Sequence, residues 1–349
     1  MKRIDNIMPT DKAAQAAAHD RWSSIAKPLG SLGLLETAIE KISAIQGTEN
    51  ADISKRSVVV MCADNGVVCE GVTQSDSSVT AICANAIANG TSNINALADT
   101  FGAEVLAVDI GVKSNLNNPK ILDRKIAFGT KNIAEGAAMT NEQAERAICV
   151  GMDIVRDLKN SGTKMIVTGE MGIGNTTVSS ALSAVILDLP PCQVTGRGAG
   201  LDSERLKKKI SVIERAIFVN KPDKNKPVEL LSKLGSFDIA GMIGLFLGGA
   251  YYHIPVVIDG VISAAAAVLA CKINPLAAEY MFPSHISAEP SGKMLLESIG
   301  LKPLITAEMR LGEGTGGVML LPLLDGALAV YNNAHRFDDI LLERYKELK

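Results

Sequence analysis

The sequence predicts an α/β fold in which a parallel sheet carries helices on both faces. Short runs of β-branched residues alternate with longer alanine-rich stretches of helical character, and several of these runs end directly in polar loops that contain glycine. Alternation of this kind is typical of a parallel sheet whose strands are joined by crossover helices. We expect the strands at 57–61, 105–110, 164–168 and 255–258.

The loops that follow the expected strands are candidate binding loops. Three of them are polar and contain glycine, at 63–66, 169–172 and 259–260. In open α/β sheets, ligands bind in the crevice beyond the carboxyl ends of the strands. We therefore expect these three loops to share one crevice.

Clear strands are missing from both ends of the chain. The sequence before residue 51 and after residue 290 has helical character instead. We expect a large α/β domain at 51–290 and a small helical domain built from 1–50 plus 291–349.

One stretch, 239–271, is almost uncharged and long enough to cross a bilayer. It is interrupted by Tyr251, Pro255 and Asp259, and such interruptions favour a buried helix–strand–helix unit over a membrane span. The N-terminal residues lack the apolar core of a secretory signal, so we expect a cytoplasmic protein.

Composition and charge argue against several classes of partner. The 349 residues are 47% hydrophobic and 4% aromatic, with a formal net charge of −3. This charge offers no electrostatic basis for binding nucleic acid or acidic membranes, and so few aromatic rings provide no stacking platform for single strands. The six cysteines and four histidines are scattered along the chain, so we expect no structural metal. A small polar substrate fits best.

A glycine-rich segment, 311–317, contains a single carboxylate, Glu313, just before the apolar run 318–330. Glycines permit close approach of the backbone to a ligand, and the N–H groups that open the following helix point at whatever lies over the loop. Glu313 is therefore the leading candidate for a catalytic base. The alternative is that it only complements the helix dipole, and this loop alone favours neither interpretation.

A second glycine loop, 169–177, follows an expected strand and opens an apolar helix. Its backbone amides and polar side chains are suited to bind a phosphate at a helix N-terminus. It is not a Walker A loop, because no Gly-Lys-Ser/Thr follows at the required spacing. A third glycine cluster, 195–202, precedes three lysines at 207–209. Either one of these lysines reaches a phosphate, or the triplet is a solvated helix face.

Taken in order, these segments resemble the nicotinate-nucleotide:dimethylbenzimidazole phosphoribosyltransferase family, which activates the lower-ligand base of cobamides. The resemblance covers nearly the whole chain. It rests on the segments 27–36, 63–72, 108–112, 129–133, 169–177, 196–202, 259–263, 284–290 and 309–316.

The resemblance implies a Rossmann-like sheet, a small domain from both chain ends and usually a homodimer. It also implies a reaction in which the 5-phosphoribosyl group of nicotinate mononucleotide passes to a base, with release of nicotinate and inversion of C1′ from β to α. A pyridinium is a good leaving group, so the enzyme mainly holds donor and acceptor in line and moves one proton. The resemblance implies no metal, ATP or cofactor.

Single residues gain roles from the same resemblance. Glu313 matches the family's general base, and Glu170 matches a second acidic residue close to the ribose and nicotinate. A carboxylate base works best when partly removed from water, so we expect Glu313 to be partly desolvated. The residues expected at the phosphate and the nucleotide are Gly172, Ile173, Gly174, Asn175, Thr176, Thr177, Lys209, Gly314, Thr315 and Gly316.

Departures from the family pattern are concentrated near the expected acceptor pocket. Asn65 stands where the family commonly has histidine, and Ile82 stands where users of dimethylbenzimidazole have a glutamine beside the base. A buried amide left unpaired costs about 1–3 kcal/mol, so isoleucine suits a more apolar acceptor. The residues we assign to the acceptor pocket are Asp64, Asn65, Ser77, Ile82 and Leu311.

Two classes of acceptor remain open with equal weight, a benzimidazole such as dimethylbenzimidazole and a phenolic acceptor such as phenol or p-cresol. Some relatives that use phenols work as paired, non-identical subunits, so the expected assembly is a homodimer or a heterodimer with a paralogous subunit. A competing hypothesis is a non-catalytic or partner-dependent subunit. The intact Glu313 and loop 172–177 argue against it, whereas the substitutions at Asn65 and Ile82 argue for it.

Overall fold

The computed structural model describes residues 3–346 and contains, within that range, one six-stranded sheet in the order β3-β2-β1-β4-β5-β6. Every neighbouring pair of strands is parallel, which confirms the predicted fold class. Residues 1–2 and 347–349, the outer ends of the expected small domain, lie outside the described range. The strands are β1 (Arg56–Ala63), β2 (Ala103–Gly111), β3 (Leu122–Asp123), β4 (Met165–Met171), β5 (Val256–Ile258) and β6 (Met281–Pro283).

The four expected strands are all present, as β1, β2, β4 and β5. Every residue of β1 is buried, because helices cover both faces of the sheet, and this burial explains its largely apolar sequence. The sequence did not predict β3 and β6. β3 contains only two residues, and β6 consists of Met281, Phe282 and Pro283, which include no β-branched residue and end in a proline.

The direction of chain progression reverses beside β1, which pairs with β2 on one side and with β4 on the other. A reversal of this kind opens a crevice beyond the carboxyl ends of the two diverging strands. The loops that begin at Asp64 and Gly172 both start at the rim of this crevice, because β1 ends at Ala63 and β4 at Met171.

Helices cover both faces of the sheet, since right-handed crossovers that run in opposite directions place their helices on opposite sides. One helix, α10, lies against β1, β2 and β4, and α5 packs along it. Their close approach requires glycine, because a Cβ on Gly151 would overlap the carbonyl oxygen of Gly241. The covering helices are α3 (Ser78–Asn89), α4 (Asn93–Phe101), α5 (Asn141–Asn160) and α10 (Phe237–Tyr252).

The uncharged stretch 239–271 forms α10, β5 and α11 (Val261–Ile273), which confirms the predicted helix–strand–helix unit. Nearly all of its residues are buried in the core. Across residues 3–346, no helix has the length and apolar character needed to cross a membrane.

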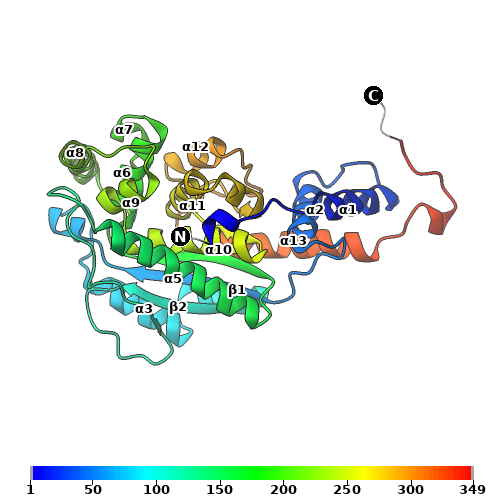
Figure 1. Ribbon diagram of the computed structural model, residues 1–349, viewed down its shortest axis with the longest axis horizontal. Helices are drawn as coiled ribbons and strands as arrows, with labels where there is room; N and C mark the ends of the chain where they lie inside the picture. The colour runs from blue at the N-terminus through cyan, green and yellow to red at the C-terminus, as the bar shows by residue number, and fades with distance from the viewer. Residues whose placement is uncertain (1–2, 347–349) are drawn as a thin grey trace.

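Helices from the two chain ends lie together at one end of the molecule (Figure 1). Here α1 (Lys12–Ser24) packs on α2 (Leu34–Gln46), and α13 (Thr315–Asn333) packs on α2 and α4. The rings of Trp22 and Tyr331 have centroids 4.8 Å apart and join the first helix to the last. In contrast, α12 (Ser291–Ser298) packs on α11 and on α6. The domain bounds 51–290 and 1–50 plus 291–349 therefore remain a proposal.

Four helices between β4 and α10 form a group at the opposite end of the molecule (Figure 1). The glycine-rich loop 169–177 leads into the first of these helices, and the loop 195–202 connects the second to the third. These helices are α6 (Asn175–Leu187), α7 (Pro191–Val194), α8 (Ser203–Asn220) and α9 (Pro227–Leu234). The remaining short helices are η1 (Ile4–Asn6), η2 (Gly66–Glu70), η3 (Pro275–Tyr280) and η4 (Asp338–Ile340).

Candidate active site

A cavity of about 230 Å³ lies beyond the carboxyl ends of β4 and β5. Of the three loops expected to share a crevice, 169–172 and 259–260 contribute to its wall, together with segments that precede α8, α12 and α13. The lining residues are Glu170, Met171, Gly172, Ile173, Asn175, Thr176, Gly198, Ala199, Asp259, Gly260, Val261, Ile262, Ser263, His285, Ser287, Glu289, Arg310, Leu311, Gly312 and Glu313.

The loop that carries Glu313 has an unusual backbone. Gly312, Glu313 and Gly314 have successive φ angles of 89°, 62° and 92°, a left-handed conformation that strains a residue with a side chain. The loop lies directly on β4, because Gly169 has no Cβ to meet the Glu313 carbonyl oxygen, which would be only 2.6 Å away. The glycines on both sides of the contact therefore bring Glu313 to the end of the sheet.

Asp259 fixes the start of the following helix. One oxygen of its carboxylate accepts the N–H of Gly317 at 3.0 Å, and the other accepts the N–H of Gly314 at 3.3 Å. Asp259 is thus the carboxylate that complements the N-terminus of α13. In the sequence, Asp259 is recognisable as an acidic residue directly after a predicted strand. Only the fold shows that it binds the start of α13.

Glu313 contacts a different helix. Its Oε2 accepts the N–H of Ile94 at 3.2 Å, in the first turn of α4. The side chain is only 8% exposed yet lines the cavity. Glu313 is therefore largely desolvated, and its carboxylate lies between α4 and the space open to a ligand.

Glu170, at the end of β4, belongs to a buried network of carboxylates. The side-chain amide nitrogen of Asn175 donates to Oε2 of Glu170 and, at 3.0 Å, to Oδ2 of Asp238. Asp238 is fully buried at the start of α10 and also accepts a hydrogen bond from Ser236. Burial raises the pKa of Glu170 well above its ordinary value, and the negative charge of Asp238 raises it further. Sequence reasoning missed Asp238, although an acidic residue in an apolar stretch was a signal.

Only some residues of the expected phosphate loop, 172–177, line the cavity. Gly172, Ile173, Asn175 and Thr176 line the cavity, and Gly174 is the left-handed N-cap of α6. Thr177 instead points into the protein. It is fully buried, and its hydroxyl has no hydrogen-bond partner among the described residues.

Lys209 comes to the same helix terminus from α8 and is only 1% exposed. Its Nζ donates to Oγ1 of Thr176 at 3.0 Å and to the carbonyl oxygen of Gly196 at 3.2 Å. Burial lowers the pKa of Lys209 to about 8, and the nearby Glu289 carboxylate opposes that change. Lys207 and Lys208 are exposed on a solvated helix face, whereas Lys209 is the lysine directed to the N-terminus of α6, and its contact with a phosphate remains a proposal.

Residues 314–316, which follow Glu313, hold the loop in place through contacts inside the protein. Thr315 donates its hydroxyl to the carbonyl oxygen of Gly312 at 2.8 Å, and Gly316 leaves room for the imidazole of His285, which a Cβ would overlap. His285 is buried and lines the cavity, and burial lowers its pKa. Gly314, Thr315 and Gly316 are themselves not among the cavity-lining residues.

The five expected acceptor residues do not lie together. Leu311, with 54% of its surface exposed, lines the cavity beside Glu313. Asp64, Asn65 and Ser77 line a separate hollow of about 540 Å³ on the other side of the 63–66 loop. Ile82 is 64% exposed on α3 and lines neither. Asn65 connects the two spaces, because its amide donates to the carbonyl oxygen of Ile173 at 3.1 Å.

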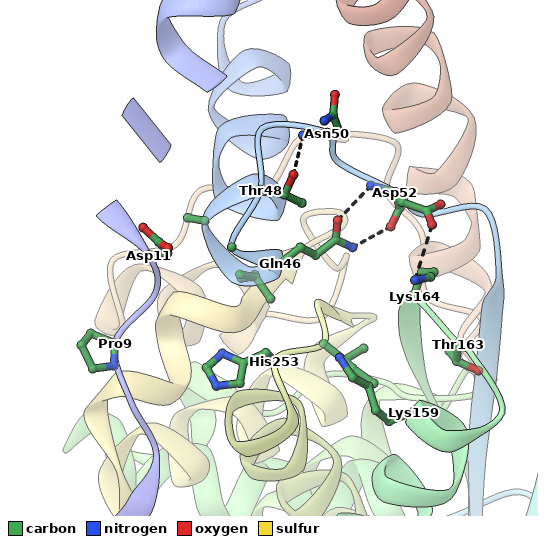
Figure 2. A pocket seen from close by; sticks show the side chains of 14 residues that line it. Pro9, Asp11, Gln46, Thr48, Asn50, Asp52, Lys159, Thr163, Lys164 and His253 are labelled. Atoms are coloured by element: carbon green, nitrogen blue, oxygen red, sulfur yellow. Dashed lines mark hydrogen bonds and ion pairs between the residues drawn. The ribbon is translucent and has the colours of Figure 1, made fainter. Parts of the chain in front are cut away.

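A larger hollow of about 660 Å³ lies elsewhere, at the amino ends of the strands (Figure 2). Its polar groups mostly satisfy one another: Asp52 pairs with Lys164 at 3.6 Å and exchanges backbone hydrogen bonds with the side chain of Gln46. Lys159, Lys164 and His253 are all exposed there. We therefore place the candidate active site at the smaller cavity. Within residues 3–346, no three His, Cys, Asp or Glu side chains gather as a metal site.

The fold and the cavity define a class of protein, an α/β enzyme that places two buried carboxylates beside a helix N-terminus and a buried lysine. A family model described as "Phosphoribosyltransferase" matches residues 7–340. The chain belongs to the nicotinate-nucleotide:dimethylbenzimidazole phosphoribosyltransferase family, as the sequence resemblance implied. It is thus an enzyme of the pentosyltransferase class.

Similar proteins cover almost the whole chain. A nicotinate-nucleotide–dimethylbenzimidazole phosphoribosyltransferase of Acetivibrio thermocellus is 46% identical over 326 residues, covering 93% of each chain. One of Clostridium acetobutylicum is 42% identical over 346 residues, 99% of this chain and 98% of the relative. The crystal structure of CobT from Thermus thermophilus superposes with a TM-score of 0.90 at 36% identity, covering 95% of this chain and 100% of that one.

Proposed function

We propose that the protein transfers the 5-phosphoribosyl group of nicotinate mononucleotide to the lower-ligand base of a cobamide, giving an α-riboside phosphate and nicotinate. The observation that carries this proposal is the meeting of Glu313, Glu170 and the N-terminus of α6 on one cavity. The names of the relatives, which include the donor nucleotide and dimethylbenzimidazole, support it.

The donor's phosphate is held at the N-terminus of α6. Gly172, Ile173, Asn175 and Thr176 line the cavity at this terminus, and Lys209 adds a positive charge through its contact with Thr176. Glu170 lies toward the ribose and nicotinate. Because its pKa is raised, Glu170 keeps its proton to a higher pH than an ordinary glutamate, so it is less repelled by the carboxylate of nicotinate.

The transfer itself is a substitution at C1′ of the ribose. The acceptor's lone pair forms the new bond on the face opposite nicotinate, and the electron pair of the breaking C–N bond returns to the pyridinium nitrogen. Nicotinate then leaves with a neutral ring nitrogen. Glu313 takes the N–H proton of a benzimidazole or the O–H proton of a phenol, which leaves the product uncharged at the new bond.

Dimethylbenzimidazole is the first candidate acceptor, because the relatives' names specify it. Phenol and p-cresol form the second candidate class, suggested by Ile82 in the place of a glutamine, although Ile82 does not line the cavity of this chain. Leu311, the acceptor residue that lines the cavity, is apolar and suits either ring.

The assembly is also part of the proposal, as a homodimer or as a heterodimer with a paralogous subunit. Leu311 and Ile82 are both more than half exposed, which favours, as a second candidate function, a subunit that turns over only with a partner chain. This candidate differs from the first in one respect only, the need for that partner.

A turnover assay of the purified single chain tests the proposal. The chain is mixed with nicotinate mononucleotide and, separately, with dimethylbenzimidazole, adenine, phenol and p-cresol, and the riboside phosphates are identified by mass spectrometry. Product with dimethylbenzimidazole supports this base as the acceptor. Product with phenol or p-cresol supports the phenolic class of acceptor instead. If none of the acceptors yields product until a paralogous chain is added, the partner-dependent function replaces the first.

A further inference from the structure

The carboxylate of Glu289 is bound to the glycine-rich loop 195–202. Its Oε1 accepts the N–H of Gly198 at 3.0 Å, and its Oε2 lies so close to Gly196 that a Cβ on this residue would overlap it. Glu289 also lines the candidate cavity, as do Gly198 and Thr176. The carboxylate therefore sits where the loop, the helix α6 and the cavity meet.

The groups around Glu289 are those that bind anions. Gly198 offers a backbone N–H from a left-handed turn, with φ of 53°. A Cβ on the same glycine would lie 2.9 Å from Oγ1 of Thr176 and 3.5 Å from Nζ of Lys209. A buried ammonium group such as that of Lys209 requires a nearby anion. Glu289 supplies that negative charge and thereby partly opposes the lowering of the pKa of Lys209 by burial.

We infer that Glu289 occupies the anion site of the free protein and that the phosphate of the donor nucleotide displaces it. This inference rests on the proposed function. Two anions cannot share the N–H of Gly198 and the field of Lys209 without repulsion. A phosphate has more charge and more acceptor oxygens than a carboxylate, so it competes successfully, whereas an unphosphorylated nucleoside leaves Glu289 in place. Glu289 is thus an internal competitor that holds the site in the free protein and that a phosphorylated donor displaces on binding.

Binding of inorganic phosphate, measured by calorimetry, tests the inference without any acceptor. The Glu289→Gln variant keeps an oxygen for the N–H of Gly198 but removes the charge. We expect it to bind phosphate about tenfold more tightly than the unchanged protein, because the competing anion is gone. The titrations are made at about pH 6.5, below the pKa of about 8 that Lys209 has in the unchanged protein.

Glu297→Gln is the matched control. Glu297 lies on α12, close in sequence to Glu289, but it is exposed and pairs with Lys293 at 3.6 Å. This variant removes the same charge from the protein and should leave phosphate binding unchanged. A second variant, Glu289→Asp, keeps the charge on a shorter side chain that cannot reach Gly198 as well, and an intermediate affinity is expected.

Equal or weaker phosphate binding by both Glu289 variants would overturn the inference, because Glu289 would then serve only to order the loop. Absence of phosphate binding in every variant would overturn it too. The outcome is separate from the proposed function. Tighter phosphate binding by Glu289→Gln without turnover of the nucleotide refutes the function alone, whereas turnover with unchanged phosphate affinity refutes the inference alone.

Discussion

The side-chain amide of Asn175 donates to Asp238 at 3.0 Å, and the same nitrogen donates to Glu170. One neutral group therefore holds two carboxylates that burial has already made hard to ionise. The arrangement couples the protonation of Glu170, on the cavity wall, to Asp238, which does not line the cavity.

Replacing Asp238 with Asn should shift the pH dependence of turnover. The negative charge of Asp238 raises the pKa of Glu170, so its removal lowers that pKa and Glu170 loses its proton at lower pH. If the protonated form is the active one, the alkaline limb of kcat/KM moves to lower pH. The profile is measured for Asp238→Asn and for Asp188→Asn, an exposed control at the end of α6. If the alkaline limb of kcat/KM stays at the same pH in Asp238→Asn, the charge of Asp238 does not control the protonation of Glu170.

Glu313→Gln should reduce kcat by about 10²- to 10⁴-fold, because the amide preserves the shape but cannot accept the proton. The side-chain oxygen of glutamine can still accept the N–H of Ile94, so folding and binding of nicotinate mononucleotide should change little. Steady-state rates and calorimetric affinities separate the two effects. Turnover equal to that of the unchanged protein at neutral pH would remove Glu313 as the base.

Gly316→Ala should destabilise the protein by about 1–3 kcal/mol, because the added Cβ overlaps the buried ring of His285 and must displace it. Gly326 lies on the same helix, is exposed, and has open space where a Cβ would be. Gly326→Ala should therefore stabilise by about 0.5–1 kcal/mol through helix propensity. Urea denaturation of both variants gives the comparison. Equal effects of the two substitutions would contradict the packing around His285.

Lys209→Met should raise KM for nicotinate mononucleotide by about 10- to 100-fold, the loss expected when the charged donor to Thr176 is removed from the phosphate site. Lys208→Met, at an exposed neighbouring position, is the control and should have little effect. In the unchanged protein, KM should also rise with pH above about 8, because Lys209 has a pKa of about 8 and loses its positive charge there. The Lys209→Met variant should lack that rise, and its persistence would show that another group titrates.

The pKa of Lys209 also predicts a stability change. It is lowered from 10.5 to about 8, so between these values the unfolded chain binds a proton that the folded protein does not. Stability attributable to this residue should therefore increase as pH rises from about 8 toward 10.5. Thermal unfolding at several pH values should show this increase in the unchanged protein relative to Lys209→Met.

Much of the fold was readable from the sequence, because the central strands are buried on both faces and therefore retain continuous runs of apolar, β-branched residues. The helix–strand–helix unit of 239–271 was readable for the same reason. The edge strands β3 and β6 were not, since β3 has only two residues and β6 has no β-branched residue, unlike the equally short β5.

The candidate site was readable where the local backbone demands particular residues. Glycines on both sides of Glu313, and the glycine loop that opens α6, follow from left-handed φ angles and from close contact with β4. These requirements act over a few neighbouring residues, so they leave a mark in the sequence. Glu170 was identified through the family resemblance, and the structure places it as the last buried residue of β4.

Only the tertiary structure decided which distant groups meet. It selected Lys209 over its two neighbours, buried Thr177 away from the cavity, and separated Asp64, Asn65 and Ser77 from Leu311. It also brought Asp238, Asp259 and His285 to the site from separate segments. Such meetings depend on how helices pack on the sheet, which is a property of many residues at once. The sequence by itself determined the family, the four strands β1, β2, β4 and β5, and the loops that carry the two glutamates.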